Sequence, residues 1–105
     1  MTVKNQFSNL QDLIASSTTP VLVVFYATWC PGSQMLAPIL SQVKTQMGNQ
    51  IQVVQINSDS YPQLASEHQV QALPTSILFQ NGFPVLRIKG VLQAPILIQK
   101  LQKYL

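Results

Sequence analysis

Apolar residues recur along the chain with two different periods, which separates predicted helices from predicted strands. They follow helical spacing from Leu10 to about Ser16, and Ser8 with Gln11 has the form of an N-terminal capping box. Residues 21–27 are instead almost uninterruptedly apolar, β-branched or aromatic. Such a run is typical of a strand buried on both faces. The pattern therefore predicts a first helix followed by a central strand.

A long helix is predicted from Pro31 to about Met47. Apolar side chains keep the helical period through this segment, at Met35, Leu36, Ile39, Leu40, Val43 and Met47. Pro38 removes one backbone hydrogen bond and predicts a kink, and Gly48 provides a C-terminal stop.

A second strand and a short helix follow. Residues 51–56 have the composition of a strand. Ser60 and Gln63 form a capping pair that predicts the start of a short helix, with Leu64 and Ala65 facing inward.

The last third of the chain predicts a hairpin and a closing helix. Residues 75–80 and 84–89 read as strands joined by Asn81-Gly82, which is the strongest short hairpin signal. A helix over residues 94–105 is expected to follow Gly90. It is expected to bury Ile96, Leu97, Leu101 and Leu105.

Alternating strands and helices that end in a hairpin predict an α/β fold, with a mixed sheet and helices on both faces. The 105 residues, of which 47% are hydrophobic and 9% charged, suffice for one core, so residues 1–105 are expected to form a single domain. The longest apolar run is far shorter than the roughly 20 residues that span a bilayer. The start of the chain does not resemble an export signal. We expect a soluble protein with no membrane association.

Charge adds little to this picture. The net charge is +3, but the six basic residues do not form a run. Nucleic-acid binding requires a clustered basic stripe, so no nucleic-acid partner is expected.

Cys30 is the only cysteine, so the chain cannot form an internal disulfide. A free thiol fits a reducing cytoplasm, where we expect the protein to reside. A lone cysteine is often a small buried hydrophobe. Cys30, however, follows a predicted strand and precedes Pro31 at a predicted helix N-terminus, a setting that lowers a thiol pKa. We therefore predict that Cys30 is a reactive nucleophile.

The segment Trp29-Cys30-Pro31-Gly32-Ser33, read with Leu73-Pro74-Thr75 and Gly90, resembles the thioredoxin family. That family has a Trp-Cys-x-x-Cys pattern followed later by a cis-proline. The resemblance spans nearly the whole chain and implies the thioredoxin fold, a central mixed β-sheet flanked by helices on both faces. The middle pair, Pro31-Gly32, is reversed from the commonest family order.

The resemblance also implies a site. A cis Leu73–Pro74 bond would place the Leu73 backbone beside Cys30, where an extended partner segment pairs with it by strand addition. The residues implied in substrate binding are Trp29, Pro31, Gly32, Leu73, Pro74, Thr75, Gly90 and Val91.

Two departures from the family pattern affect the chemistry. Ser33 occupies the position of the second, resolving cysteine, and Val24 occupies the position of a buried aspartate. Ser33 cannot close a disulfide, although its hydroxyl can donate a hydrogen bond to the Cys30 thiolate one helical turn away. Without a resolving cysteine the aspartate has no task. In many family members a lysine accompanies that aspartate, and Gln55 occupies its position here. Because the aspartate and the lysine are both absent, we interpret Ser33 as the native residue rather than a laboratory replacement of a cysteine.

The first hypothesis is a monothiol oxidoreductase. Cys30 would form mixed disulfides with a protein partner that carries a disulfide or a modified cysteine, and an external thiol such as glutathione would resolve them. Glutathione would then be a co-substrate, with no bound cofactor, and the protein would be a monomer.

Three alternatives stay open. The chain could be a redox-inactive or redox-gated partner-binding module, or a dithiol thioredoxin whose resolving cysteine was replaced by Ser33. It could also be a Cys30-linked dimer or iron–sulfur species. His68 is the only imidazole and has no Cys/His cluster around it. It is interpreted as a surface residue that closes the short helix, with no metal site.

Overall fold

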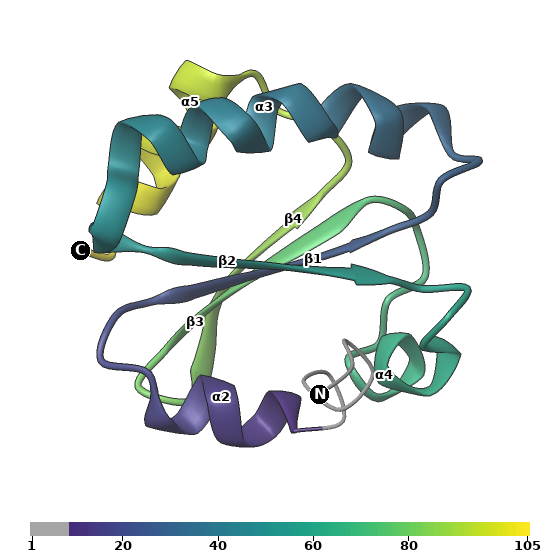
Figure 1. Ribbon diagram of the computed structural model, residues 1–105, viewed down its shortest axis with the longest axis horizontal. Coiled ribbons are helices and arrows are strands. Elements are labelled where there is room, and N and C mark those ends of the chain that lie inside the picture. The colour runs from purple at the N-terminus through teal and green to yellow at the C-terminus, as the bar shows by residue number, and fades with distance from the viewer. Residues whose placement is uncertain (1–8) are drawn as a thin grey trace.

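A computed structural model describes residues 9–105, which form a four-stranded mixed sheet between two layers of helices (Figure 1). The strands are β1 (Val21–Tyr26), β2 (Gln52–Asn57), β3 (Thr75–Gln80) and β4 (Phe83–Lys89). The helices are α2 (Leu10–Ser16), α3 (Pro31–Met47), α4 (Pro62–Glu67) and α5 (Ala94–Gln102), with a 3₁₀ turn, η1 (Gly48–Gln50), after α3. The predicted fold class, an α/β sheet covered on both faces, is confirmed.

The strand order is β2-β1-β3-β4, which places β1 inside the sheet. It pairs in parallel with β2 and antiparallel with β3, and β3 pairs antiparallel with β4. Helices α3 and α5 lie over one face of the sheet, and α2 and α4 lie over the other (Figure 1).

The continuous apolar run of β1 is explained by these two layers. Successive side chains of a strand point to opposite faces, so Leu22 and Val24 enter the cluster beneath α3 and α5, whereas Val23 and Phe25 enter the cluster beneath α2 and α4. Each buried aliphatic side chain contributes about 1.5–3 kcal/mol. The strand that carries the Cys30 turn is therefore anchored on both faces of the sheet.

The long helix and the hairpin agree with the predicted positions. Helix α3 runs through Pro38 to Met47. Asn81 and Gly82 both have positive φ angles between β3 and β4, as a two-residue hairpin turn of this kind requires. Strand β4 begins at Phe83, one residue earlier than expected, and a register irregularity lies between Leu78 and Phe79.

The predicted capping pairs need correction. Ser8, of the first capping box, lies outside the described residues, and Asn9 is the N-cap of α2. The Ser60–Gln63 pair is wrong, because Tyr61 is the N-cap of α4 and Ser60 lies one residue before it. The Asn57 side-chain oxygen instead accepts the N–H groups of Asp59 and Ser60.

Two predictions of buried residues in the closing helix are also wrong. Ile96 is 46% exposed, because Ala94, Leu97, Ile98 and Leu101 form the inward stripe of α5. Helix α5 ends at Gln102, so Leu105 lies beyond it and is exposed. In α4, Leu64 is partly buried and packs against the cluster beneath α2 and α4, and Ala65 is buried, so both face inward as expected.

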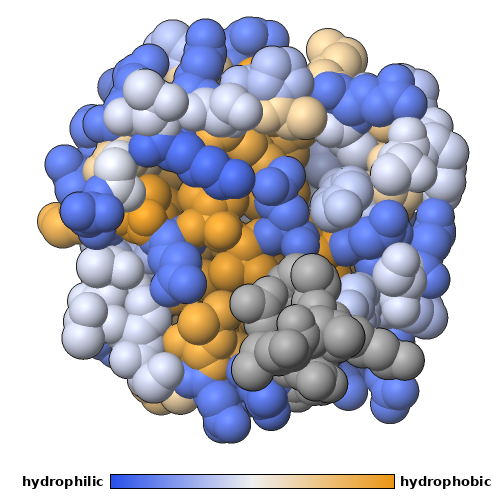
Figure 2. Space-filling model, in the orientation of Figure 1, coloured by the Kyte–Doolittle hydropathy of each residue, from blue (hydrophilic) through white to orange (hydrophobic). Residues whose placement is uncertain are grey.

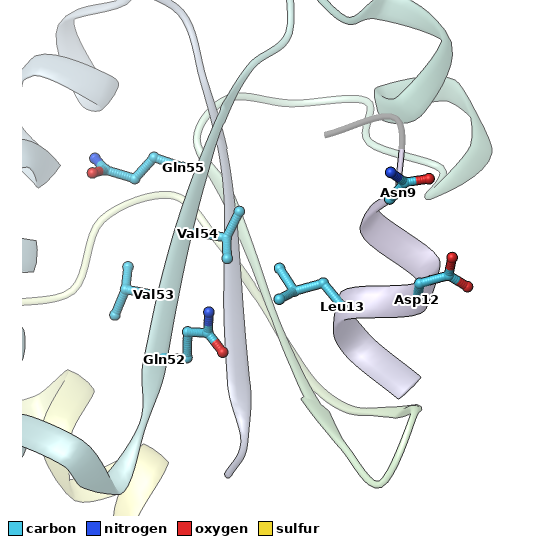
Figure 3. Close-up of a pocket in the computed structure, with 7 residues that line it drawn as sticks. All are labelled: Asn9, Asp12, Leu13, Gln52, Val53, Val54 and Gln55. Carbon is cyan, nitrogen blue, oxygen red and sulfur yellow. The ribbon is translucent and has the colours of Figure 1, made fainter. Parts of the chain in front are cut away.

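A hollow of about 480 Å³ lies between α2 and the edge strand β2 (Figure 3). It is lined by Asn9, Asp12, Leu13, Gln52, Val53, Val54 and Gln55. Figure 2, in the orientation of Figure 1, shows an apolar surface in the middle of the side of the molecule that faces the viewer. The hollow shares no residue with the Cys30 turn.

No helix within residues 9–105 is long and apolar enough to cross a bilayer.

Candidate functional site

Cys30 lies where the chain passes from β1 into α3. It is the N-cap residue of α3, with an extended backbone, and Pro31 is the first residue of the helix. The Cys30 N–H donates to the Ala27 carbonyl at 3.2 Å, and the Gln34 N–H donates to the Cys30 carbonyl at 3.0 Å. The Gln34 side-chain amide donates to the Thr28 carbonyl at 2.7 Å. The turn that presents the thiol is therefore held from both sides.

The Cys30 thiol is free and has a pKa below that of an ordinary cysteine. The largest cause is the hydrogen bond from the Ser33 backbone N–H, followed by the bond from the Ser33 hydroxyl. Partial desolvation opposes these bonds, and the Gly32 N–H adds to them. The unpaired N–H groups of the first turn of α3 are thus what favours the thiolate.

Ser33 is 7% exposed and lies on the inner side of the turn. Its Oγ accepts the Ala27 N–H at 3.2 Å. Because that contact uses a lone pair of the oxygen, the hydroxyl proton is available to Cys30. The predicted hydrogen bond from Ser33 to the Cys30 thiolate is consistent with this arrangement.

The loop before β3 lies on the other side of the sulfur. The Cys30 Sγ donates to the Leu73 carbonyl at 3.5 Å, and the Leu73–Pro74 bond is cis. The Gly90 N–H donates to the Pro74 carbonyl at 2.8 Å. The Leu73–Pro74 segment is thereby fixed between the thiol and the end of β4.

Gly32 lies where the Cys30 turn and the Leu73–Pro74 segment approach most closely. A Cβ on Gly32 would lie 3.0 Å from Pro74 Cδ and 3.7 Å from a methyl group of Val91. A side chain at this position would therefore force the two segments apart. Gly32, Leu73, Pro74 and Val91, all predicted site residues, are brought together here.

Thr75 does not lie on this surface. Its side chain is 1% exposed, and its hydroxyl donates to the Ala72 carbonyl at 2.6 Å. Thr75 can therefore position Pro74, and its predicted contact with a partner would have to be made by its backbone.

Trp29 projects from the other side of the Cys30 turn. Its ring is 65% exposed, and its Nε1–H donates to Asp59 Oδ2 at 2.6 Å. The sequence prediction assigned no role to Asp59. A carboxylate placed directly after β2, where the carboxyl end of that strand lies beside the end of the parallel strand β1, was the available signal.

The thioredoxin family model matches residues 1–103. The chain belongs to the thioredoxin family. Members of this family are thiol–disulfide oxidoreductases, so the general kind of chemistry follows from the membership.

Individual thioredoxins resemble the chain over most of its length. A thioredoxin-like protein of Synechocystis sp. is 54% identical over 104 residues and is covered to 99%, as is this chain. Chloroplastic thioredoxin Y of Oryza sativa subsp. japonica is 45% identical over 97% of this chain, which spans 61% of that protein. The crystal structure of a chloroplastic thioredoxin z superposes with a TM-score of 0.84 at 35% identity, covering 91% of this chain and 87% of that one.

Val24 stands where the thioredoxin pattern has a buried aspartate. It is 1% exposed and belongs to the apolar cluster beneath α3. Gln55, in place of the accompanying lysine, accepts a hydrogen bond from the Lys44 Nζ at 3.3 Å. Val24 therefore cannot supply the proton-transferring carboxylate of the family pattern.

His68 closes α4, as predicted, but it is half-buried rather than a surface residue. It is the C-cap of α4, and its ring lies 5.6 Å from the Phe25 ring and 5.8 Å from the Phe79 ring. Burial lowers the pKa of His68, Glu67 raises it and Arg87 lowers it, with a net downward shift. Among residues 9–105 no group of three or more His, Cys, Asp or Glu side chains could hold a metal ion.

This environment predicts a pH-dependent stability. The folded protein binds the His68 proton less tightly than the unfolded chain does, so stability is full above the ordinary histidine pKa of about 6.5 and falls as the pH drops through the lower folded pKa. Urea unfolding of the wild type and His68→Phe from pH 7.5 to 5 measures this. The expected result is a smaller loss in His68→Phe, which keeps the ring packing. Equal losses would contradict the assignment.

Proposed function

We propose that the protein is a monothiol oxidoreductase in which Cys30 forms mixed disulfides with protein partners. The observation that carries the proposal is the pairing of a thiol with a lowered pKa and a buried hydroxyl at the resolving position. A thiolate attacks disulfides, whereas a hydroxyl cannot form one.

The first step joins Cys30 to the partner. The Cys30 thiolate attacks one sulfur of a disulfide, a new S–S bond forms, and the other sulfur leaves as a thiolate. With a glutathionylated cysteine, attack on the glutathione sulfur releases the partner's thiolate and leaves glutathione on Cys30. No electrons enter or leave in this exchange.

The second step needs a thiol from outside the chain, because residues 1–105 contain no second cysteine. A glutathione thiolate attacks the glutathione sulfur bound to Cys30, releases the Cys30 thiolate and forms oxidised glutathione. With an ordinary protein disulfide, the same resolution acts on the mixed disulfide between Cys30 and the partner. Two glutathione molecules are then oxidised in all, and they supply the two electrons that reduce the partner's disulfide. Glutathione acts here as a co-substrate, and the cycle uses no bound cofactor.

A partner segment would dock in the surface between Trp29 and Val91, which we call the Cys30 groove. The residues proposed to form it are the predicted substrate-binding residues Trp29, Pro31, Gly32, Leu73, Pro74, Gly90 and Val91. The Leu73 carbonyl, which faces the thiol at 3.5 Å, is available to an N–H of an extended partner segment. Strand addition at this carbonyl would bring the partner's sulfur to Cys30.

The proposal predicts the pH dependence of Cys30 alkylation. We expect the rate to rise with pH through a midpoint below about 8.5, the pKa of a free thiol. In Ser33→Ala the midpoint should rise but stay below that value, because the backbone N–H of residue 33 remains. Iodoacetamide alkylation of the reduced protein, followed by mass spectrometry, gives the midpoints. An unshifted midpoint in the wild type would contradict an activated thiol.

Activity is tested by the removal of glutathione from a glutathionylated protein in excess glutathione. The wild type should accelerate removal and Cys30→Ala should not. No acceleration by the wild type refutes the monothiol oxidoreductase.

A redox-gated binding module is the second candidate, favoured by the exposed Trp29 ring that Asp59 holds in place. In that case Cys30→Ala would keep its affinity for a partner that the reduced wild type binds. Complete loss of this affinity would exclude the module.

A further inference from the structure

The end of β4 lies directly beside the Cys30 groove. Lys89, the last residue of β4, is paired with Thr75, the residue that follows Pro74. The Gly90 N–H closes this end of the hairpin on the Pro74 carbonyl at 2.8 Å, and the positive φ of Gly90 turns the chain away after Lys89. Lys89 is therefore held in register with the groove by two strands.

The position of Lys89 allows its charge to act on a docked segment. Residues paired across antiparallel strands have Cα atoms about 4.5–5.5 Å apart, and their side chains share a face of the sheet. Thr75 is two residues from Leu73, where the partner segment would pair. The Lys89 ammonium, on its flexible four-carbon stem, can come within about 10 Å of such a segment, which is close to the Debye length at physiological salt.

The Lys89 ammonium is also without an interaction partner among residues 9–105. Its side chain is exposed, and the structure gives it no hydrogen bond and no ion pair within residues 9–105. Arg87, on the same face of β4, is engaged, because its Nη2 donates to the His68 carbonyl at 2.8 Å. The carboxylate of Asp59 accepts a hydrogen bond from the groove residue Trp29.

We propose that Lys89 is a specificity-determining residue that selects partner segments with an acidic residue close to the target cysteine. This inference rests on the proposed exchange chemistry at Cys30. The residues that line the Cys30 groove are uncharged, so one ammonium at its edge is the main charge that a docked segment meets on that side. An exposed ion pair typically changes a rate or an affinity by about 2- to 5-fold.

The test uses peptides that each carry one cysteine blocked as a disulfide with 2-thiopyridine. Attack by the Cys30 thiolate on the peptide sulfur releases pyridine-2-thione, which is followed by absorbance. Otherwise identical peptides place Asp, Asn or Lys at each of the two positions on either side of the cysteine. The rates of the Asp and Lys peptides are divided by that of the Asn peptide, which cancels any change in the pKa of Cys30.

The proteins compared are the wild type, Lys89→Gln, Lys89→Glu and Lys103→Glu. Lys103→Glu gives the same change in net charge as Lys89→Glu, and Lys103 is the C-cap of α5, at the opposite end of that helix from the residues that follow Val91. At one or more positions, the Asp-to-Lys rate ratio should fall about 3-fold in Lys89→Gln and about 10-fold in Lys89→Glu. It should stay unchanged in Lys103→Glu, and molar salt should weaken the preference.

The outcomes separate the two proposals. If no peptide reacts with the wild type, the exchange chemistry itself fails. If all peptides react and the ratio is the same in every protein, only the role of Lys89 is overturned. An equal fall in Lys103→Glu would overturn it too, because net charge would then be the cause.

Discussion

Ser33→Cys is expected to reduce insulin with dithiothreitol at least about 10-fold faster than the wild type. A second thiol within the molecule has an effective concentration far above that of any external thiol, so it releases the mixed disulfide much faster. The rest of the site is already in place, because the Cys30 pKa is lowered mainly by a backbone N–H that the substitution keeps. Turbidity of the precipitating insulin B chain measures the rate.

The position of Ser33 favours this outcome. It lies three residues after Cys30 in the first turn of α3, and residues at this spacing are neighbours on a helix surface. Its side chain already contacts the Ala27 N–H inside the turn. A sulfur in place of Oγ would occupy the same buried space.

Two variants control the Ser33→Cys experiment. Ser33→Ala should show no gain over the wild type, because it adds no second thiol. The double variant Cys30→Ala, Ser33→Cys should be inactive, because the buried thiol at position 33 is not the attacking group. If Ser33→Cys forms its internal disulfide but gains no activity, the scaffold has lost the resolving step for reasons other than the missing sulfur. The binding module would then be favoured.

The fold could be predicted because its signals are local. The apolar run of β1, the Asn81-Gly82 turn and the helical spacing of α3 each depend on residues close together in the chain. Cys30, Ser33 and Pro31 were found for the same reason, since a strand end followed by a helix N-terminus is a local feature.

The parts that could not be predicted depend on contacts between distant segments. Trp29 and Asp59 meet only because β1 and β2 run in parallel and end side by side. Lys89 reaches the groove through its pairing with Thr75, and His68 is half-buried because two rings from β1 and β3 meet it. The Ser60–Gln63 cap failed because Asn57, three residues before Ser60, already holds the turn.

The two departures from the family pattern act on one part of the site. With Ser33 at the resolving position, there is no second thiol that would have to be deprotonated to release the mixed disulfide. Val24 removes the carboxylate that the family places there. A carboxylate without that task would only bring the cost of its desolvation, which is why the two replacements belong together.

Restoring the carboxylate alone should therefore be harmful. Val24→Asp is expected to lose about 3–5 kcal/mol of stability at pH 8, because the side chain would lie without a countercharge in the apolar cluster beneath α3. Val24→Asn, of similar size but uncharged, should lose less, about 2–3 kcal/mol, through lost apolar burial and an unpaired amide. Urea unfolding at pH 8 and pH 5 measures both.

The pH dependence identifies the charge as the cause. Burial disfavours the ionised form, so the pKa of Asp at position 24 should lie above its unfolded value of about 3.9. The folded state then binds the proton more tightly than the unfolded chain, and stability returns as the pH falls through the raised pKa toward the unfolded value. The gap between Val24→Asp and Val24→Asn should shrink from pH 8 to pH 5. A constant gap, or a stable Val24→Asp at pH 8, would mean that a carboxylate is tolerated at position 24. The lack of an aspartate at this position would then give no support to Ser33 being the native residue.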